Sequence, residues 1–598
     1  MTEDSGSSIK FPDPVEWSKT MARIAESSQR MVSDFLNRQG SADGLGMGDP
    51  LNVGHAFLEM AARMMTDPAK IMQAQMSLWQ DYLNLWQNAT LRFLGETTQP
   101  IVTPAKEDKR FKDAAWNENV VFDYLKQSYL LTARWLQQTT RSVEGLDDKT
   151  AKKVDFYTRQ FVDAMAPSNF VMTNPEVLRT TIESGGENLL RGLNNLLTDL
   201  ERGKGSLSIR MTDPNAFRIG GNIAVTPGKV VYRNDLMELI QYNPTTETQF
   251  RRPLLIMPPW INKYYILDLR ETNSLVKWTT EQGLTTFVIS WVNPDEHLAK
   301  KTFEDYMMEG PLAALTAIEQ ATGEAEVNLV GYCLGGTLLA STLAYMAAKN
   351  DHRIPSATFL ATLVDFSEVG EISVFIDEEQ IEALEHRMSR TGYLEGNAMA
   401  TTFNMLRAND LIWSFVVSNY LLGKDPFPFD LLYWNSDATR MPAAMHSFYL
   451  RKMYQENRLI EPGGIALNGV PIDLGLIETP SFIVATREDH IAPWRTVYAA
   501  TQLYRGPVKF LLGASGHIAG IVNPPAAAKY NYWTSDQTPR DPEAWLKAAG
   551  ATPGSWWPEW LAWVMRFAGD KVPARQPGAG KLKALADAPG TYVKVRLQ

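Results

Sequence analysis

The sequence predicts an α/β protein whose mostly parallel sheet follows a helical N-terminal domain and contains a large insertion. From about residue 209, short apolar segments alternate with amphipathic helical segments, a pattern typical of a parallel sheet covered by helices. Residues 1–208 read as helical and lack clear strand signals. More than a hundred residues separate the fourth expected strand from the fifth, far more than an ordinary loop needs. We therefore expect a helical domain over 1–208, an α/β domain over 209–598 and, within it, a cap over 366–476.

Six short segments are the expected strands of the sheet. They are rich in apolar and β-branched residues, as fully buried strands are. In chain order they are 253–257, 285–291, 327–332, 357–363, 481–486 and 508–512.

The clearest helix of the N-terminal domain begins at Asp67-Pro68, because Asp is a good N-cap and Pro is favoured at the first helical position. Large apolar side chains then recur at three- and four-residue steps, which places them on one helix face. They are Met76, Trp79, Leu83 and Trp86. Such a face either packs on its own domain or docks a partner, and the sequence leaves both interpretations open.

Composition and charge argue against several functional classes. The chain is 44% hydrophobic and 21% charged, as packed globular proteins are. A formal net charge of −10 argues against a nucleic-acid partner, because phosphate backbones require a basic surface. The single cysteine excludes an intrachain disulfide. The N-terminal MTEDSGSSIK lacks the apolar core of a signal peptide. No apolar run approaches the roughly 18 residues of a membrane span. We expect a soluble protein of the reducing cytoplasm without a transmembrane segment.

The strongest motif is an apolar segment that leads into GYCLGG (331–336) and then into a helical stretch. Strand, G-x-C-x-G-G and helix in this order form a nucleophile elbow, in which small residues permit the strained turn that holds the nucleophile. This context predicts an α/β-hydrolase fold with Cys333 as the nucleophile. The alternative is a small buried apolar residue, which is what most lone cysteines are. A thiol suits thioester chemistry, because it exchanges with a thioester and keeps the acyl group activated for transfer to an alcohol.

The partners of this cysteine are expected later in the chain, since triads of this fold occur in the order nucleophile, acid, histidine. A late predicted strand leads to Asp489, and the last predicted strand leads to His517 in a glycine-containing loop. We therefore predict that Asp489 orients His517, which acts as the base toward Cys333. Glu488 and Asp365 are rival acids, and a surface carboxylate or turn cap is the alternative interpretation of Asp489.

Backbone N–H groups are the expected oxyanion donors. In this fold one comes from the residue after the nucleophile, here Leu334, and the other from the loop after the first of the six expected strands. That loop is 258–265, and since its two prolines cannot donate, Ile261 or Trp260 is the candidate. A rigid Pro-Pro turn without a chemical role is the alternative.

Five stretches of this chain together resemble the polyhydroxyalkanoate synthases, and the likeness extends from about residue 95 to the C-terminus. They occur in the family's order: PPWINKYYILDL (258–269), GYCLGG (331–336), FDLLYWN (429–435), REDHI (487–491) and GHIAG (516–520). The chain length and APSNF (166–170) resemble the class I enzymes, which are single-subunit types that act mainly on short acyl chains.

The resemblance implies an acyltransferase that polymerises (R)-3-hydroxyacyl-CoA thioesters into polyhydroxyalkanoate, with release of CoA, through a covalent acyl-cysteine. It assigns Cys333 as nucleophile, His517 as general base and Asp489 as its partner. It also implies a homodimer in the cytoplasm at the surface of polymer granules, with granule-coating proteins as further partners. No cofactor is expected, because the substrate itself carries the CoA. The alternatives are a cysteine-dependent thioesterase or other hydrolase on the same fold and a non-catalytic granule or membrane-surface scaffold that retains a degenerate hydrolase fold.

The expected cap is rich in aromatic residues, which suits an apolar tunnel that shields an acyl-enzyme from water. Trp434 and Tyr449 are candidate walls of this tunnel, and the alternative is that they form the core of the cap itself. For the Met- and Trp-rich helix face, the resemblance suggests the granule, a granule-coating protein or a second subunit as the partner.

Overall fold

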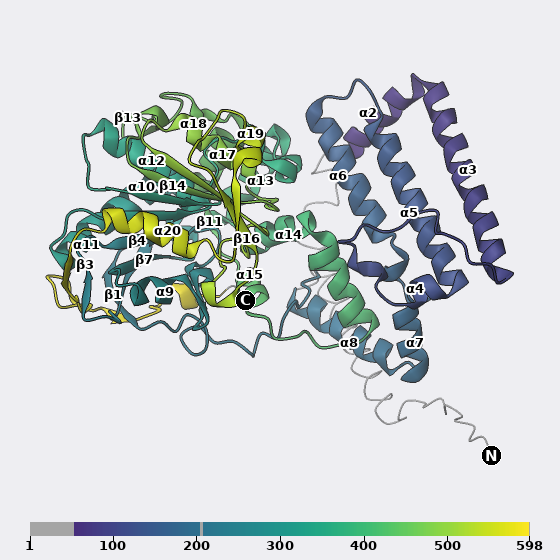
Figure 1. The fold of residues 1–598 in the computed structure, drawn as a ribbon, viewed down its shortest axis with the longest axis horizontal. Coiled ribbons are helices and arrows are strands. Elements are labelled where there is room, and N and C mark those ends of the chain that lie inside the picture. Colours follow the sequence, from purple (N-terminus) through teal and green to yellow (C-terminus); the bar gives the residue numbers. More distant parts are fainter. Residues whose placement is uncertain (1–52, 204–206, 597–598) are drawn as a thin grey trace, which may run out of the picture. The chain divides into compact units, whose positions relative to one another are not determined.

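The computed structural model describes residues 53–203 and 207–596, which divide into two compact units (Figure 1). Of these residues, the N-terminal unit contains 53–203, 207–213 and 403–428, and the α/β unit contains 214–402 and 429–596. The first 52 residues of the expected N-terminal domain, with the signal-peptide prediction made for them, lie outside the described residues. In the described ranges, no helix is long and apolar enough to cross a membrane.

The N-terminal unit is built from helices, as the sequence predicts. They are α2 (Val53–Met65), α3 (Pro68–Phe93), α4 (Ala115–Glu118), α5 (Val120–Arg141), α6 (Asp148–Ala164), α7 (Pro175–Glu183) and α8 (Glu187–Arg202). Helix α3 begins at Pro68, where the Asp67 side chain accepts a hydrogen bond from the Lys70 backbone N–H. One face of α3 packs on α5, with Leu85 buried and the Tyr82 hydroxyl 2.7 Å from Thr132 Oγ1.

The segment 403–428 belongs to the N-terminal unit, although it lies within the range expected as a cap. It contains the end of α14 (Gly396–Leu406) and two π-helical turns, η7 (Asn409–Trp413) and η8 (Val416–Leu421). The segment passes so close to α8 that a Cβ atom on Gly192 would overlap the backbone of Tyr420. The Tyr420 hydroxyl also donates to Asp199 at 2.8 Å. The range 366–476 therefore contributes to both units.

An 11-stranded sheet forms the centre of the α/β unit. Its six parallel strands are adjacent, and they are the six that the sequence predicts. In spatial order they are β7 (Thr286–Trp291), β4 (Leu254–Met257), β8 (Asn328–Tyr332), β9 (Ala357–Leu360), β14 (Ser481–Thr486) and β15 (Val508–Gly513). Every residue of the first five is buried, so helices and loops cover both faces of the parallel sheet.

Antiparallel strands extend the sheet at both edges, and the sequence patterns do not predict them. They are β2 (Met237–Tyr242), β1 (Gly228–Arg233) and β19 (Ala586–Asp587) beyond β7, and β16 (Asn531–Thr534) and β17 (Gly550–Pro553) beyond β15. In β2 a charged residue, Glu238, interrupts the apolar pattern, although it is fully buried in the sheet. It is stabilised by Arg233 and by the backbone N–H groups of Thr591 and Tyr592.

Helices pack around this sheet (Figure 1). They are α9 (Leu275–Glu281), α10 (Phe303–Met307), α11 (Ala313–Thr322), α12 (Leu334–Ala348), α17 (Trp494–Tyr498), α18 (Ala500–Leu503), α19 (Pro542–Ala548) and α20 (Trp557–Val564). Helices α9 and α20 lie side by side, with the ring of Trp278 5.4 Å from that of Trp557. Helix α12 is buried from Leu334 to Met346, so it is held on all sides directly after β8.

The part of the expected cap that lies in the α/β unit adds α13 (Glu378–Thr391), α15 (Asp430–Ser436), α16 (Ala443–Phe448) and the π-helical η9 (Tyr449–Gln455). Four two-stranded ladders complete the unit. They pair β3 (Thr248–Phe250) with β18 (Lys571–Pro573), β5 (Asp268–Arg270) with β6 (Asn273–Ser274), β10 (Tyr393–Leu394) with β11 (Met441–Pro442), and β12 (Ala466–Leu467) with β13 (Val470–Pro471).

Candidate active site

The turn between β8 and α12 has the geometry of a nucleophile elbow. Cys333 lies at this turn with φ +50° and ψ −120°, a strained conformation for a residue with a side chain. Its thiol is only partly buried, and its backbone N–H donates to the Leu360 carbonyl at 2.8 Å. A Cβ on Gly335 would overlap the Met257 carbonyl oxygen, and one on Gly336 would overlap Thr362. The two glycines of the motif are therefore required by the close packing of the turn.

Asp489 and His517 meet at the ends of neighbouring strands. Asp489 follows β14 and His517 follows β15, and Asp489 Oδ2 lies 2.7 Å from His517 Nδ1. The other carboxylate oxygen of Asp489 accepts the backbone N–H groups of Ile491 at 2.8 Å and Ala492 at 2.9 Å. The His517 side chain is 8% exposed and that of Asp489 is fully buried. The carboxylate is thus fixed on two sides, and it fixes the imidazole in turn.

The rival acids lie elsewhere. Glu488 is exposed, and the Asp365 side chain accepts hydrogen bonds from Asn457 and from the backbone N–H of Ser367. Among the three carboxylates considered from the sequence, the structure places Asp489 against His517.

The surroundings of His517 favour the charged form of its imidazole. Burial opposes the charge, but the charges of Asp489 and Cys333 and the hydrogen bonds to both outweigh it, and they raise the pKa of His517 well above its ordinary value. The Tyr332 hydroxyl donates to the His517 backbone carbonyl at 3.0 Å, and the two rings stack with centroids 5.6 Å apart. This arrangement can hold a thiolate–imidazolium pair, which is a ready nucleophile.

An aromatic group lies beside the thiol. Burial raises the pKa of Tyr449 and of Tyr454, and in both the nearby Cys333 contributes in the same direction. Their rings contact edge to face at 5.3 Å, and the Phe366 ring contacts both. Tyr449 is a tunnel wall predicted from the sequence, whereas Tyr454 is not predicted. Two residues five positions apart do not share a face of an α-helix. Both tyrosines lie on η9, however, and its π-helical i→i+5 hydrogen bonds bring their side chains to the same face.

The loop after β4 is pinned next to the start of α12. The Trp291 indole donates to the Pro258 carbonyl at 2.8 Å, and Thr439 donates to the Trp260 carbonyl at 2.7 Å. Leu334 is buried at the first position of α12, and Ile261 is partly buried in the loop. The oxyanion role of these backbone groups stays a prediction.

Trp434 supports this loop. Its indole is 6% exposed and donates to the Lys263 carbonyl at 2.7 Å. The Lys263 ammonium in turn lies 2.7 Å from Asp437, within a buried ion pair. Trp434 therefore lies in the packed core of the α/β unit, and its role as a tunnel wall stays a prediction.

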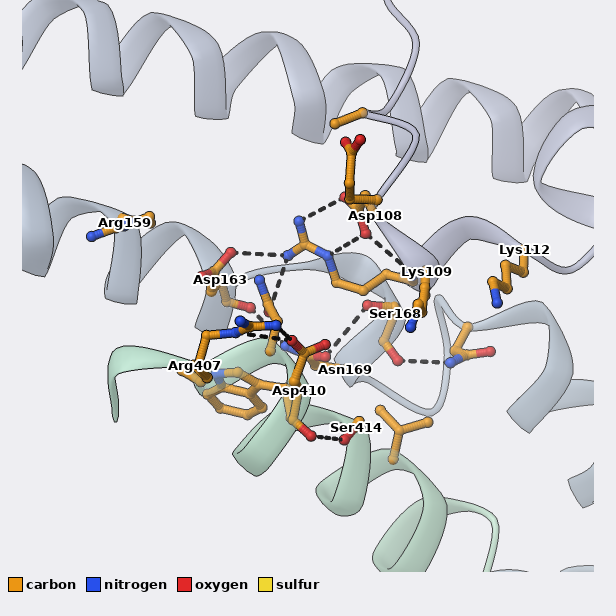
Figure 2. Close-up of a pocket in the computed structure, with 18 of the residues that line it drawn as sticks. Asp108, Lys109, Lys112, Arg159, Asp163, Ser168, Asn169, Arg407, Asp410 and Ser414 are labelled. Carbon is orange, nitrogen blue, oxygen red and sulfur yellow. Dashed lines mark hydrogen bonds and ion pairs between the residues drawn. The ribbon is translucent and has the colours of Figure 1, made fainter. Parts of the chain in front are cut away.

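A cavity of about 730 Å³ lies within the N-terminal unit (Figure 2). Arg110 pairs there with Asp108 at 2.8 Å and with Asp163 at 3.1 Å. Arg407 pairs with Asp410 (Figure 2). Both arginines are thus neutralised locally, and hydrogen bonds join the 403–428 segment to the helices: Arg110 donates to Asn409 at 3.4 Å and Gln160 donates to the Met405 carbonyl at 3.1 Å. The lining contains none of the predicted site residues. In the part of the chain that the structure describes, no group of three or more His, Cys, Asp or Glu side chains is arranged to hold a metal ion.

Two family models match consecutive parts of the chain. Residues 107–279 match the Poly-beta-hydroxybutyrate polymerase (PhaC) N-terminus, and residues 280–524 match the alpha/beta hydrolase fold. With the sheet order, the second match confirms the predicted fold.

Curated relatives match nearly the whole chain. The Poly(3-hydroxyalkanoate) polymerase of Methylorubrum extorquens is 54% identical over 538 residues, which are 90% of this chain and 89% of the relative. The Poly(3-hydroxyalkanoate) polymerase subunit PhaC of Rhizobium meliloti is 48% identical over 98% of this chain and 96% of its own length. That of Cupriavidus necator is 43% identical over 92% of this chain and 93% of its own length. The chain therefore belongs to the family of poly(3-hydroxyalkanoate) polymerases, acyltransferases built on an α/β-hydrolase fold.

Proposed function

We propose that this enzyme polymerises (R)-3-hydroxyacyl-CoA thioesters, with release of CoA, through an acyl group carried on Cys333. One observation carries the proposal: in a chain of this family, a thiol at a strained elbow lies beside His517, an imidazole that Asp489 orients and charges. No cofactor enters the proposed reaction, because the substrate brings its own activated thioester.

The first half-reaction transfers the acyl group to the enzyme. Since Nδ1 of His517 faces Asp489, Nε2 is the nitrogen that accepts the thiol proton. The thiolate attacks the thioester carbonyl carbon, the bond from that carbon to the CoA sulfur breaks, and the departing sulfur takes the proton from Nε2. The Leu334 N–H and that of Ile261 or Trp260 stabilise the oxyanion formed on the way.

The second half-reaction extends the polymer. The 3-hydroxyl of an incoming (R)-3-hydroxyacyl-CoA attacks the carbonyl carbon of the acyl-cysteine, its proton passes to His517 or to a nearby base, and the Cys333 thiolate leaves as the ester forms. The thiolate then attacks the CoA thioester at the end of the lengthened chain, which returns the chain to Cys333, and the departing CoA sulfur takes a proton from His517. Phe366, Tyr449 and Tyr454 form an apolar wall that keeps water from the acyl-enzyme. The attached polyester keeps the enzyme at the surface of the polymer granule, where granule-coating proteins are further partners.

CoA release from (R)-3-hydroxybutyryl-CoA tests this proposal, with the product separated by size. Wild-type enzyme should release CoA and form polymer, and Cys333→Ala should do neither. Free 3-hydroxybutyric acid as the main product would instead assign the chain to the thioesterases, and CoA release by Cys333→Ala would remove Cys333 from the mechanism.

A further inference from the structure

The loop 514–522, which carries His517, is held by three buried side-chain donors. The Tyr332 hydroxyl donates to the His517 carbonyl at 3.0 Å. The other two donors are the indoles of Trp556 and Trp557, which bond at 2.9 Å and 3.0 Å to carbonyls further along the loop. All three donor residues are at most 2% exposed. Since a buried carbonyl is costly to leave unpaired, each of these hydrogen bonds restrains the loop.

Tyr332 differs from the two tryptophans because it also contacts the reacting side chain. Its ring stacks on the His517 imidazole, with centroids 5.6 Å apart and planes 26° from parallel. An aromatic face within about 6 Å of a cation attracts the positive charge. The imidazolium of the proposed pair therefore has two stabilising neighbours, the Tyr332 ring and the Asp489 carboxylate at Nδ1.

The Tyr332 hydroxyl keeps its proton in these surroundings. Burial raises the pKa of Tyr332 well above its ordinary value, and the nearby charges of Cys333 and Asp489 act in the same direction. A neutral phenol is the donor that the His517 carbonyl requires. The influence of both charges also indicates that the phenol lies close to the nucleophile and to the acid.

Tyr332 links the strand of the nucleophile to the loop of the base. It is the last residue of β8 and directly precedes Cys333, whereas His517 follows β15. Strands β9 and β14 lie between β8 and β15 in the sheet. The Tyr332 side chain spans this separation, so it ties the position of the imidazole to that of the elbow.

We propose that Tyr332 is a positioning residue, which holds the His517 imidazole toward Cys333 through its hydroxyl and favours the imidazolium through its ring. This inference rests on the proposed function, in which His517 is the base. Two substitutions separate the contributions of the hydroxyl and the ring. Tyr332→Phe removes the hydrogen bond and keeps the ring, and Tyr332→Leu removes both.

Tyr504→Phe is the matched control for the loss of a buried hydroxyl. Tyr504 is 6% exposed in the same unit, and its ring lies 5.3 Å from that of Phe359. Among the residues that the structure describes, none is a hydrogen-bond partner of its hydroxyl. Loss of this hydroxyl should therefore leave CoA release and thiol reactivity at the wild-type level.

Steady-state CoA release from (R)-3-hydroxybutyryl-CoA is the first measurement. For Tyr332→Phe we expect kcat to fall roughly 10–100-fold with KM nearly unchanged, because the imidazole is displaced while the substrate contacts remain. Activities are compared at matched folded fractions, which urea unfolding determines. Wild-type kcat in Tyr332→Phe, or a change in KM alone, would overturn the proposal.

Alkylation of Cys333 by iodoacetamide, followed over pH without substrate, is the second measurement. Because the chain has a single cysteine, the rate reports the thiolate at that position. Tyr332→Phe should keep the wild-type midpoint. Tyr332→Leu should move it roughly 0.5–1 pH unit upward, since the imidazolium loses its aromatic neighbour. Asp489→Asn is the reference, and its midpoint should also move upward.

The alkylation profiles separate failure of this inference from failure of the proposed function. A midpoint that moves in Asp489→Asn but not in Tyr332→Leu would overturn the role of Tyr332 and leave the proposed function intact. A wild-type midpoint equal to that of an ordinary thiol, unchanged in every variant, would contradict the thiolate–imidazolium pair and would overturn both.

Discussion

Large aromatic side chains of the α/β core and those on one face of helix α3 lie in opposite environments. In the α/β unit, Trp260, Tyr332 and Trp557 are at most 1% exposed and belong to the packed core. In the N-terminal unit, helix α3 exposes Trp79 by 70% and Trp86 by 62%. Burial in the first unit holds reacting groups in place, whereas exposure in the second leaves a surface for another molecule. The contrast indicates that chemistry and association are carried by different units.

The largest effect is expected from Asp489→Asn, which acts within the α/β unit. An amide cannot stabilise the protonated imidazole, so kcat/KM for CoA release should fall roughly 10³–10⁴-fold, as for related triads. Because Asp489 raises the pKa of His517, its loss should lower that pKa and move the alkaline limit of the residual activity to lower pH. Glu488→Gln, an exposed neighbour, should retain full activity. Equal losses in the two variants would contradict the assignment of the acid.

Two glycine substitutions distinguish the contribution of each unit to catalysis. Gly335→Ala and Gly192→Ala each place a Cβ against a backbone carbonyl, and each should lower the free energy of unfolding by about 1–3 kcal/mol. Only Gly335→Ala displaces the elbow, so CoA release per folded molecule should fall strongly there and stay near wild type in Gly192→Ala. Urea unfolding and activity at matched folded fractions measure both. Gly550→Ala, which meets open space, is the control. Loss of catalysis in Gly192→Ala would contradict the proposal that the two units have separate roles.

The loss of folding stability at acid pH should originate in the α/β unit, at His446 of α16. Burial lowers the pKa of His446 to about 4, whereas the unfolded value is about 6.5. The unfolded chain therefore binds the proton first. The stability that depends on this neutral histidine is complete above pH 6.5 and is lost as the pH falls toward 4, by about 3 kcal/mol in total.

His446→Leu should remove this acid-dependent loss, and His352→Leu, at an exposed position, should not. Urea unfolding at pH 7 and at pH 4.5 is the measurement. An unchanged pH dependence in His446→Leu would show that another group causes the acid sensitivity.

A smaller effect, a few-fold, is expected at the aromatic wall. Tyr454→Ala should admit water to the acyl-enzyme and raise the share of free hydroxy acid among the products. Tyr454→Phe keeps the ring and should keep the wild-type product ratio, which chromatography of the released acid reports. The same increase in both variants would assign the effect to the hydroxyl group and not to the wall.

The sequence predicts those parts of the structure that local patterns encode. The six parallel strands are continuous apolar runs, and the elbow and its two partners each follow such a run. Strand β2 is missed because the buried Glu238 interrupts its apolar pattern, and the Arg233 that stabilises it is recognisable only in the folded chain.

The remaining differences between the predicted and the observed structure depend on contacts between residues that are distant in the sequence. The cap is expected as one insertion, yet residues 403–428 belong to the N-terminal unit, because Gly192 allows the backbone of Tyr420 to approach α8. No local pattern relates these two positions, which lie more than two hundred residues apart. Tyr454 is missed for a related reason, since the π-helical geometry that aligns it with Tyr449 is not visible in the sequence.

The most direct test of the central claim is to isolate the acyl-enzyme. Wild-type enzyme is mixed with (R)-3-hydroxybutyryl-CoA, quenched in acid and digested, and the peptide that contains Cys333 is analysed by mass spectrometry. We predict one or more 3-hydroxybutyryl units on that peptide, in a linkage that neutral hydroxylamine cleaves, and none in Cys333→Ala. Polymer formed without any acylated Cys333 peptide, or acylation that persists in Cys333→Ala, would contradict the account.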